Sequence, residues 1–144
     1  MTTKISVEDR QAIYDNLRMY AWCLDRADGA GVAGCFTPDG WVQGGTGQRF
    51  IGPVRVAEFV KNASSQPGFF GRQHHIQPLF FEDTAEGYTL TSYWQVVTWH
   101  AGEQPGVILM GYYVDKCVKV GGEWRFSEKQ INRWDSTTTP PLAQ

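Results

Sequence analysis

The feature that most constrains the fold of this chain is a change of pattern at Arg72. Before this residue, apolar side chains recur at the spacing of a helix, and after it they alternate at the spacing of a strand. The second half holds strand-like runs rich in aromatic and β-branched residues, over 72–82, 88–100, 107–120 and 124–133. Short links containing glycine join these runs, so we expect consecutive strands to pair antiparallel as a meander.

The first part of the chain predicts two helices separated from the sheet by a turn. Ser6, with an acid three residues later, is a capping-box-like start for a helix that runs to about Arg26. A second, weak helix is expected over 31–36, with Asp28 as its cap. The Thr-Pro-Asp-Gly sequence at 37–40 has the chemistry of a turn.

A hairpin and a third helix complete the first half. The glycine-rich turn at 44–47 is expected to join short strands at 41–43 and 48–51. Pro53 then begins a third helix that ends near Ser64. Helices followed by a meander indicate a single α+β domain over the whole chain (1–144), with three N-terminal helices packed on a strongly curved, mostly antiparallel sheet.

The first helix carries an acid in an unusual place. Asp25 lies at the edge of the apolar face, where a carboxylate must be paired, hydrogen-bonded or in contact with a wet cavity. A histidine is the partner best suited to proton chemistry, and His74 and His75 open the first long strand. The alternative for Asp25 is a helix-end acid that pairs with Arg26 or Arg133, or that caps the following turn.

Alternation along that strand separates the two histidines. His74, Ile76 and Phe80 are expected on one face, and His75 and Phe81 on the other. At most one of the adjacent histidines should therefore enter a cavity, and a metal site built from both is not expected. For His74, the alternative is a strand histidine that is simply hydrogen-bonded.

The aromatic content is high, with six Trp, six Tyr and eight Phe. Aromatic residues in this number suit a cavity wall or an oligomer interface as well as a core. We expect a small apolar or aromatic ligand, and a homodimer or homotrimer formed through an exposed sheet face. The candidate wall residues are Trp22, Phe36, Trp41, Phe59, Phe70 and Trp94, and the candidate hydroxyl donors are Tyr14, Tyr20 and Tyr113.

Composition excludes several classes of partner. The net charge of −2 includes no basic run, so nucleic acid is not an expected partner. No stretch approaches the ~20 apolar residues of a membrane span. The three cysteines are scattered and the start lacks a secretory pattern, so we expect reduced thiols and a cytoplasmic protein. No cofactor is implied.

Short segments in a particular order carry a family resemblance. They are Tyr20–Asp28, Phe36–Gly40, Ile51–Pro53, Arg72–Ile76 and Gly122–Phe126. Their order and spacing, over nearly the whole chain, resemble the SnoaL-like branch of the NTF2-like superfamily. The resemblance implies a cone-shaped α+β barrel around an apolar pocket.

Within that branch the chain is most similar to enzymes of the scytalone dehydratase type. Gln73–Ile76 matches a catalytic-histidine segment, Tyr93–His100 matches a second-histidine segment in spacing, and Arg133–Trp134 matches an Arg-Trp pair. By this resemblance, Asp25 and His74 would form the catalytic dyad. Dehydrochlorinase and bile-acid dehydratase relatives also use an Asp and a His at such positions.

Three further positions bear on the substrate. His100 would be a second proton carrier by the resemblance, although it lies at a strand end where exposure is the alternative. Gly111 and Tyr113 stand where that dehydratase carries Ser and Asn, so a different substrate, or a different way of orienting the pocket histidines, is expected. Arg133 is open between an ion pair with Asp25, a clamp for a substrate carboxylate and a solvated charge.

The leading hypothesis is a cofactor-independent lyase or isomerase of the dehydratase type. A base beside a carbonyl starts dehydration, dehydrohalogenation, isomerisation and aldol cyclisation alike, so the substrate is described only as a small cyclic or aromatic hydroxy or keto compound. One alternative is a non-catalytic ligand-binding module, or a protein like the small subunit of ring-hydroxylating dioxygenases. A further alternative is a polyketide cyclase.

Overall fold

The computed structural model describes residues 3–140, so the ends of the expected single domain, residues 1–2 and 141–144, lie outside it. The helices are α1 (Val7–Asp25), α2 (Gly29–Ala33) and α3 (Pro53–Ser64). The strands are β1 (Phe36–Gln43), β2 (Arg49–Ile51), β3 (Arg72–Asp83), β4 (Gly87–Thr98), β5 (Gly106–Val120) and β6 (Glu123–Arg133).

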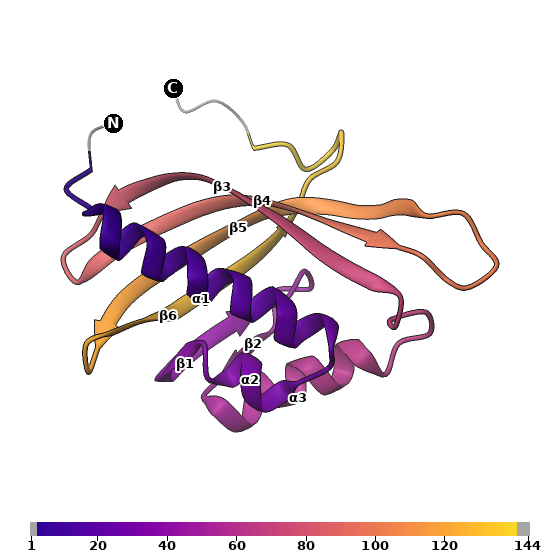
Figure 1. The fold of residues 1–144 in the computed structure, drawn as a ribbon, viewed down its shortest axis with the longest axis horizontal. Helices are drawn as coiled ribbons and strands as arrows, with labels where there is room; N and C mark the ends of the chain where they lie inside the picture. The colour runs from indigo at the N-terminus through magenta and orange to yellow at the C-terminus, as the bar shows by residue number, and fades with distance from the viewer. Residues whose placement is uncertain (1–2, 141–144) are drawn as a thin grey trace.

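One six-stranded sheet in the order β2-β1-β6-β5-β4-β3 forms the body of the protein. Strands β3 to β6 are the expected antiparallel meander, and β1 joins it by pairing parallel to β6. In Figure 1, α1 lies across one face of the curved sheet, with α2 and α3 below its C-terminal half. The α+β fold is confirmed, and the sheet is open, with β2 and β3 at its edges.

Helix α1 forms where its caps and apolar spacing predict it. The Ser6 hydroxyl accepts a hydrogen bond from the Asp9 N–H at 3.0 Å, which satisfies one of the free donors at the helix start. Ile13, Leu17 and Tyr20 recur at helical spacing and are buried against the sheet. This face positions the last residue of the helix, Asp25, close to β3.

The expected boundaries of the second helix and the following turn are wrong. Asp28 does cap α2, accepting from the Gly31 N–H at 2.8 Å, but the helix ends at Ala33 instead of residue 36. Residues 37–40 belong to β1, which joins the sheet by pairing with β6. The pairing with β6 is interrupted between Phe36 and Trp41, and this break tolerates Pro38, which has no N–H to donate.

The expected faces of the two phenylalanines on β3 are also wrong. The pairing with β4 shifts between Pro78 and Phe80, so Leu79 is an extra residue on β3. A bulge of this kind exchanges the faces of every residue beyond it. Phe81 is therefore buried in the core, while Phe80 is exposed.

A fully buried ion pair lies in the core beneath α1. Lys129 of β6 and Asp115 of β5 face each other across the sheet with 2.8 Å between Nζ and Oδ2, and neither side chain is exposed. The ammonium group also lies over the rings of Tyr113 at 3.8 Å, Tyr20 at 4.3 Å and Phe126 at 4.7 Å. These cation–π contacts tie the charge to the two tyrosines.

Burial makes this pair expensive. It raises the pKa of Asp115 and lowers the pKa of Lys129, although each charge favours the ionised form of the other. When folding raises the pKa of a carboxyl group, the folded protein loses stability as the pH rises through that pKa. When folding lowers the pKa of an amine, the folded protein loses stability as the pH falls through that pKa. At neutral pH the charged pair therefore costs the fold more in desolvation than its attraction returns.

The face of the sheet turned away from α1 carries exposed apolar side chains. Among them are Leu79, Tyr93, Val107, Ile108 and Met110. This is the face through which the sequence predicts self-association, and the homodimer or homotrimer stays a prediction. Within the described residues, no helix is both long and apolar enough to cross a membrane.

The ion pair generates a double-mutant prediction. Lys129→Met or Asp115→Leu alone leaves one uncompensated buried charge, and each should lower the free energy of unfolding by about 3–5 kcal/mol. The double variant should be close to the wild type or more stable, because it removes both desolvation costs. Urea unfolding with an unchanged m-value measures the cycle. Additive losses in the double variant would contradict this description of the core.

Candidate functional site

A cavity of about 250 Å³ lies between α1, α3 and the inner face of the sheet. Its apolar lining consists of Leu24, Phe59, Ala63, Phe69, Val96, Leu109 and Ile131, together with the Gly44–Gly45 turn. Its polar lining consists of Tyr20, Arg72, His74, Trp94, Tyr113 and Arg133. The mixture of an apolar wall and a few polar groups is typical of a small-molecule site.

Asp25 and His74, predicted as a pair from the sequence, are in direct contact. Asp25 Oδ1 lies 2.6 Å from His74 Nδ1. The same carboxylate accepts from the His74 backbone N–H, at 3.0 Å to Oδ2 and 3.2 Å to Oδ1. Only 16% of the Asp25 side chain and 14% of the His74 side chain are exposed.

The fold explains why these contacts form. Because β3 is an edge strand, backbone N–H groups on its outer edge have no strand partner. Asp25, at the C-terminal end of α1, provides an acceptor for one of them and holds the His74 ring at the same time. The carboxylate itself lines a groove between α1 and β3, whereas His74 lines both that groove and the cavity.

This geometry determines which tautomer the neutral imidazole adopts. An ionised carboxylate can only accept hydrogen bonds, so the proton between the two side chains belongs to Nδ1 of the neutral ring. Nε2 is then the nitrogen with a free lone pair, and no other described residue hydrogen-bonds to it. A ring held in this way is arranged to take a proton from a ligand in the cavity.

Two tyrosines from different elements meet at the cavity. Tyr20 of α1 and Tyr113 of β5 pack edge to face, with 6.1 Å between ring centroids and 85° between planes. Burial raises the pKa of both phenols well above the ordinary value. Both hydroxyls therefore stay protonated at neutral pH and can donate hydrogen bonds to a ligand.

Gly111 gives Trp94 its place in the wall. The two residues are register partners on β5 and β4, and the indole lies over the glycine and stacks on Tyr113 at 5.7 Å. A Cβ on Gly111 would lie 2.5 Å from Trp94 Cζ2 and 1.9 Å from the Asn132 carbonyl oxygen. The glycine therefore leaves room for the Trp94 indole.

Three of the predicted site residues lie outside the cavity. Tyr14 packs on Phe81, with 5.6 Å between ring centroids, and lines the outer groove beside Asp25. Trp41 lies at the other end of the sheet, under the Arg49 guanidinium at 4.1 Å. His100 follows the end of β4.

His100 packs on the turn that precedes β3. A Cβ on Gly71 would lie 2.9 Å from His100 Nδ1, so the ring fills the space beside that turn. Of the remaining wall candidates, Phe36 is in the core, and Trp22 and Phe70 are 60% and 64% exposed. Phe59 and Arg133 do line the cavity, and no ion pair joins Arg133 to Asp25 within residues 3–140.

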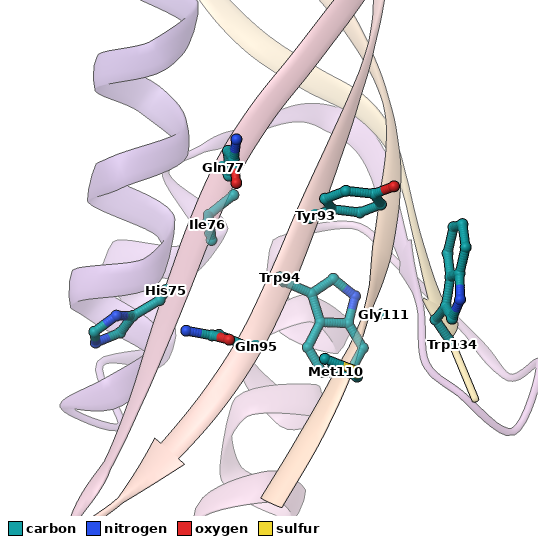
Figure 2. A pocket seen from close by; sticks show the side chains of 9 residues that line it. All are labelled: His75, Ile76, Gln77, Tyr93, Trp94, Gln95, Met110, Gly111 and Trp134. Atoms are coloured by element: carbon teal, nitrogen blue, oxygen red, sulfur yellow. The ribbon is translucent and has the colours of Figure 1, made fainter. Parts of the chain in front are cut away.

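A second hollow, of about 500 Å³, lies on the outer face of the sheet and is shown in Figure 2. His75, Gln77, Tyr93, Gln95, Met110 and Trp134 line it. Its only imidazole is His75, whose Nε2 lies 3.1 Å from the amide oxygen of Gln73. Its described lining contains no acid, so the Asp25–His74 pair makes the inner cavity the candidate site.

Two features of this region were not predicted from the sequence. Arg72 lies two residues before His74, and alternation alone could have placed it on the same face. Asp115 lies between Tyr113 and Cys117 on the same buried face of β5, so alternation along the strand could have predicted an acid in the core. Its partner Lys129 was hidden, because the β5–β6 register shifts just before it and breaks the alternation.

The described residues hold no cluster of three His, Cys, Asp or Glu side chains that could bind a metal ion.

The SnoaL-like domain family matches residues 6–130, which is most of the chain. The protein therefore belongs to the SnoaL-like family, as the order of its sequence segments predicted. No curated protein matches the chain.

Solved structures with the same fold are distant in sequence. A single-site variant of Rv3472 from Mycobacterium tuberculosis, of unknown function, is 22% identical, with a TM-score of 0.79 over 96% of this chain and 84% of that chain. Aln2 from a Streptomyces species is 20% identical, with a TM-score of 0.78 over 91% and 94%. A proposed scytalone dehydratase from Novosphingobium aromaticivorans is 21% identical, with a TM-score of 0.75 over 95% and 91%.

The close contact at Gly111 yields a prediction with an internal control. Gly111→Ala places a methyl group against a backbone carbonyl and the Trp94 ring, and should lower the free energy of unfolding by about 1–3 kcal/mol. Gly106→Ala, on the same strand, meets nothing within 4 Å and should be nearly neutral. Urea unfolding of both variants measures the difference, and equal stabilities would contradict the described packing.

Proposed function

We propose that this protein is a cofactor-independent lyase or isomerase of the dehydratase type, acting on a small cyclic or aromatic hydroxy or keto compound. The observation that carries the proposal is the 2.6 Å contact between Asp25 and His74, with His74 lining an apolar cavity. A binding module has no need of a carboxylate that orients a histidine in this way. Membership of the SnoaL-like family and the fold shared with a proposed scytalone dehydratase are compatible with it.

In the proposed reaction, His74 is the base. Nε2 takes a proton from the carbon next to the substrate carbonyl, and the electron pair of the broken C–H bond forms an enolate. Asp25 keeps the accepting tautomer in place and stabilises the imidazolium that forms. Positioned acid/base groups of this kind contribute about 10²–10⁴-fold each.

The cavity tyrosines supply the complementary donors. A hydroxyl of Tyr20 or Tyr113 donates a hydrogen bond to the carbonyl oxygen, where negative charge develops in the enolate. In a dehydratase, the enolate then expels a β-hydroxyl, which leaves as water after accepting the proton that the imidazolium holds, and this returns His74 to its neutral form. In an isomerase, the imidazolium returns the proton to another carbon. His100 takes no part in this scheme, because it lies outside the cavity.

The cavity volume bears on the alternatives. At about 250 Å³ it is below the ~300–1,000 Å³ range of drug-sized ligand sites, which favours one- or two-ring compounds over the polycyclic substrates of a polyketide cyclase. A non-catalytic ligand-binding module would share the same cavity. Such a module would bind ligands but catalyse no reaction, so replacement of His74 would change no reaction rate.

Deuterium uptake from heavy water into small cyclic ketones, followed by proton NMR, tests the first step without assuming a leaving group. The wild type should accelerate uptake, and His74→Gln should lower the rate by about 10²–10⁴-fold because the base is lost. Asp25→Asn should lower it by at least about tenfold through loss of the oriented tautomer.

His75→Gln is the matched control, because it removes the neighbouring imidazole, which lines the outer hollow of Figure 2 and does not line the inner cavity. Its rate should equal that of the wild type. Equal rates in the wild type and His74→Gln would remove the dyad from the chemistry. Absence of uptake with every ketone, combined with ligand binding, would favour the binding module.

A further inference from the structure

Arg72 brings a positive charge into the cavity beside His74. It is the first residue of β3 and shares the inner face with His74, two residues further along. Its Nε is buried and has no hydrogen-bond partner among residues 3–140. Its guanidinium carbon lies 5.9 Å from the centroid of the Phe69 ring, another part of the wall. A buried N–H without an acceptor is costly, so this group is arranged for a partner that the described chain does not supply.

Arg133 brings a second positive charge to the same cavity. It ends β6 and lines the cavity beside the Gly44–Gly45 turn, with Nε 3.5 Å from the position of a Cβ on Gly45. Neither Arg72 nor Arg133 forms an ion pair with a described carboxylate, whereas Arg18, Arg55 and Arg125 do. Arg72 lines the cavity with its Nε buried, whereas Arg133 lines it as an exposed residue, and neither has an ion-pair partner among the described residues.

Apart from His74 Nε2, which is an acceptor, the other polar side chains of the cavity can donate hydrogen bonds. The Trp94 Nε1–H is buried and has no acceptor in the described part of the chain. Among the described residues, no Asp, Glu, Asn or Gln side chain lines the cavity, and Asp25 is held by the His74 ring and backbone. A ligand that satisfies this site must bring acceptor oxygens, and at least one of them must carry negative charge.

We propose that the cavity binds its ligand as a carboxylate, held by Arg72 with Arg133 adding charge, so that the substrate is a small cyclic or aromatic carboxylic acid. A guanidinium matches the two oxygens of a carboxylate in a planar, bidentate arrangement. A carboxylate carries a single charge, so it costs less to desolvate in this apolar cavity than a phosphate dianion. The Trp94 N–H is then available to a second ligand oxygen, such as a carbonyl.

This inference names the substrate class of the proposed enzyme, and it therefore rests on the proposed function for its chemistry. It does not depend on that function for binding. The carboxylate would be anchored at one side of the cavity, and the carbon that loses its proton would lie within reach of His74 Nε2. Anchoring of this kind orients the reacting carbon and lowers the entropic part of the barrier.

Calorimetric titration with naphthoate and naphthamide tests the inference, because the two probes share a shape and differ in charge. The wild type should bind the acid at least about tenfold more tightly than the amide. Arg72→Met should lower the affinity for the acid by about 10- to 100-fold and leave the affinity for the amide unchanged. Arg49→Met is the matched control: it removes an arginine that stacks on Trp41 outside the cavity, and should change neither affinity.

Two additional variants keep the test decisive. Arg72→Lys should retain part of the preference for the acid, since it keeps the charge and loses the bidentate geometry. His74→Gln should abolish proton abstraction and retain the preference, which separates this inference from the proposed function. Loss of the preference in His74→Gln would instead assign the carboxylate to the imidazole and overturn the inference.

Inorganic phosphate provides the remaining comparison. We expect it to bind more weakly than naphthoate, because it lacks the apolar body that the cavity wall contacts. Equal affinity of wild-type protein for naphthoate and naphthamide, binding of neither, or tighter binding of phosphate than of naphthoate would overturn the inference. If Arg72→Met does not fold, the wild-type comparison of acid and amide together with Arg72→Lys decides the question.

Discussion

The carboxylate of Asp25 is the interaction on which the site depends. It binds the ring and the backbone N–H of His74 at once, and so joins the end of α1 to the open edge of the sheet. Each contact supports the other: the helix position brings the acid to β3, and the hydrogen bonds offset the cost of holding a carboxylate largely away from water. The same contacts fix the orientation and tautomer of the imidazole. They therefore both hold α1 against β3 and prepare His74 to accept a proton.

Around this pair, the fold holds charged side chains within largely apolar surroundings. Lys129 and Asp115 are fully buried beneath α1 and lie against the rings of Tyr20 and Tyr113, the tyrosines that face the cavity. Gly111 leaves space for the Trp94 indole, which completes the wall. Arg72 and Arg133 then contribute positive charge without a counterion among the described residues. The cavity is thus apolar in surface and rich in donors, with one oriented base, and this combination suits an oxygenated, acidic ring compound.

Much of this arrangement could be predicted from the sequence, because local patterns determine it. Helical spacing placed Asp25 at the end of α1, alternation separated His74 from His75, the family resemblance selected His74, and short links gave the β3–β6 meander. The errors arose where pairing between distant strands overrides local pattern. A bulge at Leu79 exchanges the faces of Phe80 and Phe81. A register shift on β6 places Lys129 in the core, against the alternation of its strand. Pairing with β6 includes Pro38 in β1, where a turn was expected. The position of His100 depends on packing against Gly71, which sequence spacing does not encode.

The most direct test of this account is the tautomer of His74, measured by nitrogen-15 NMR under alkaline conditions that leave imidazole uncharged. The account predicts that His74 carries its proton on Nδ1 in the wild type, against the ordinary preference of imidazole for Nε2–H, and that Asp25→Asn weakens or abolishes this state. His75 and His100 should show the ordinary preference in both proteins. A wild-type His74 protonated on Nε2, or a ring unaffected by Asp25→Asn, would contradict the central role of the Asp25–His74 pair.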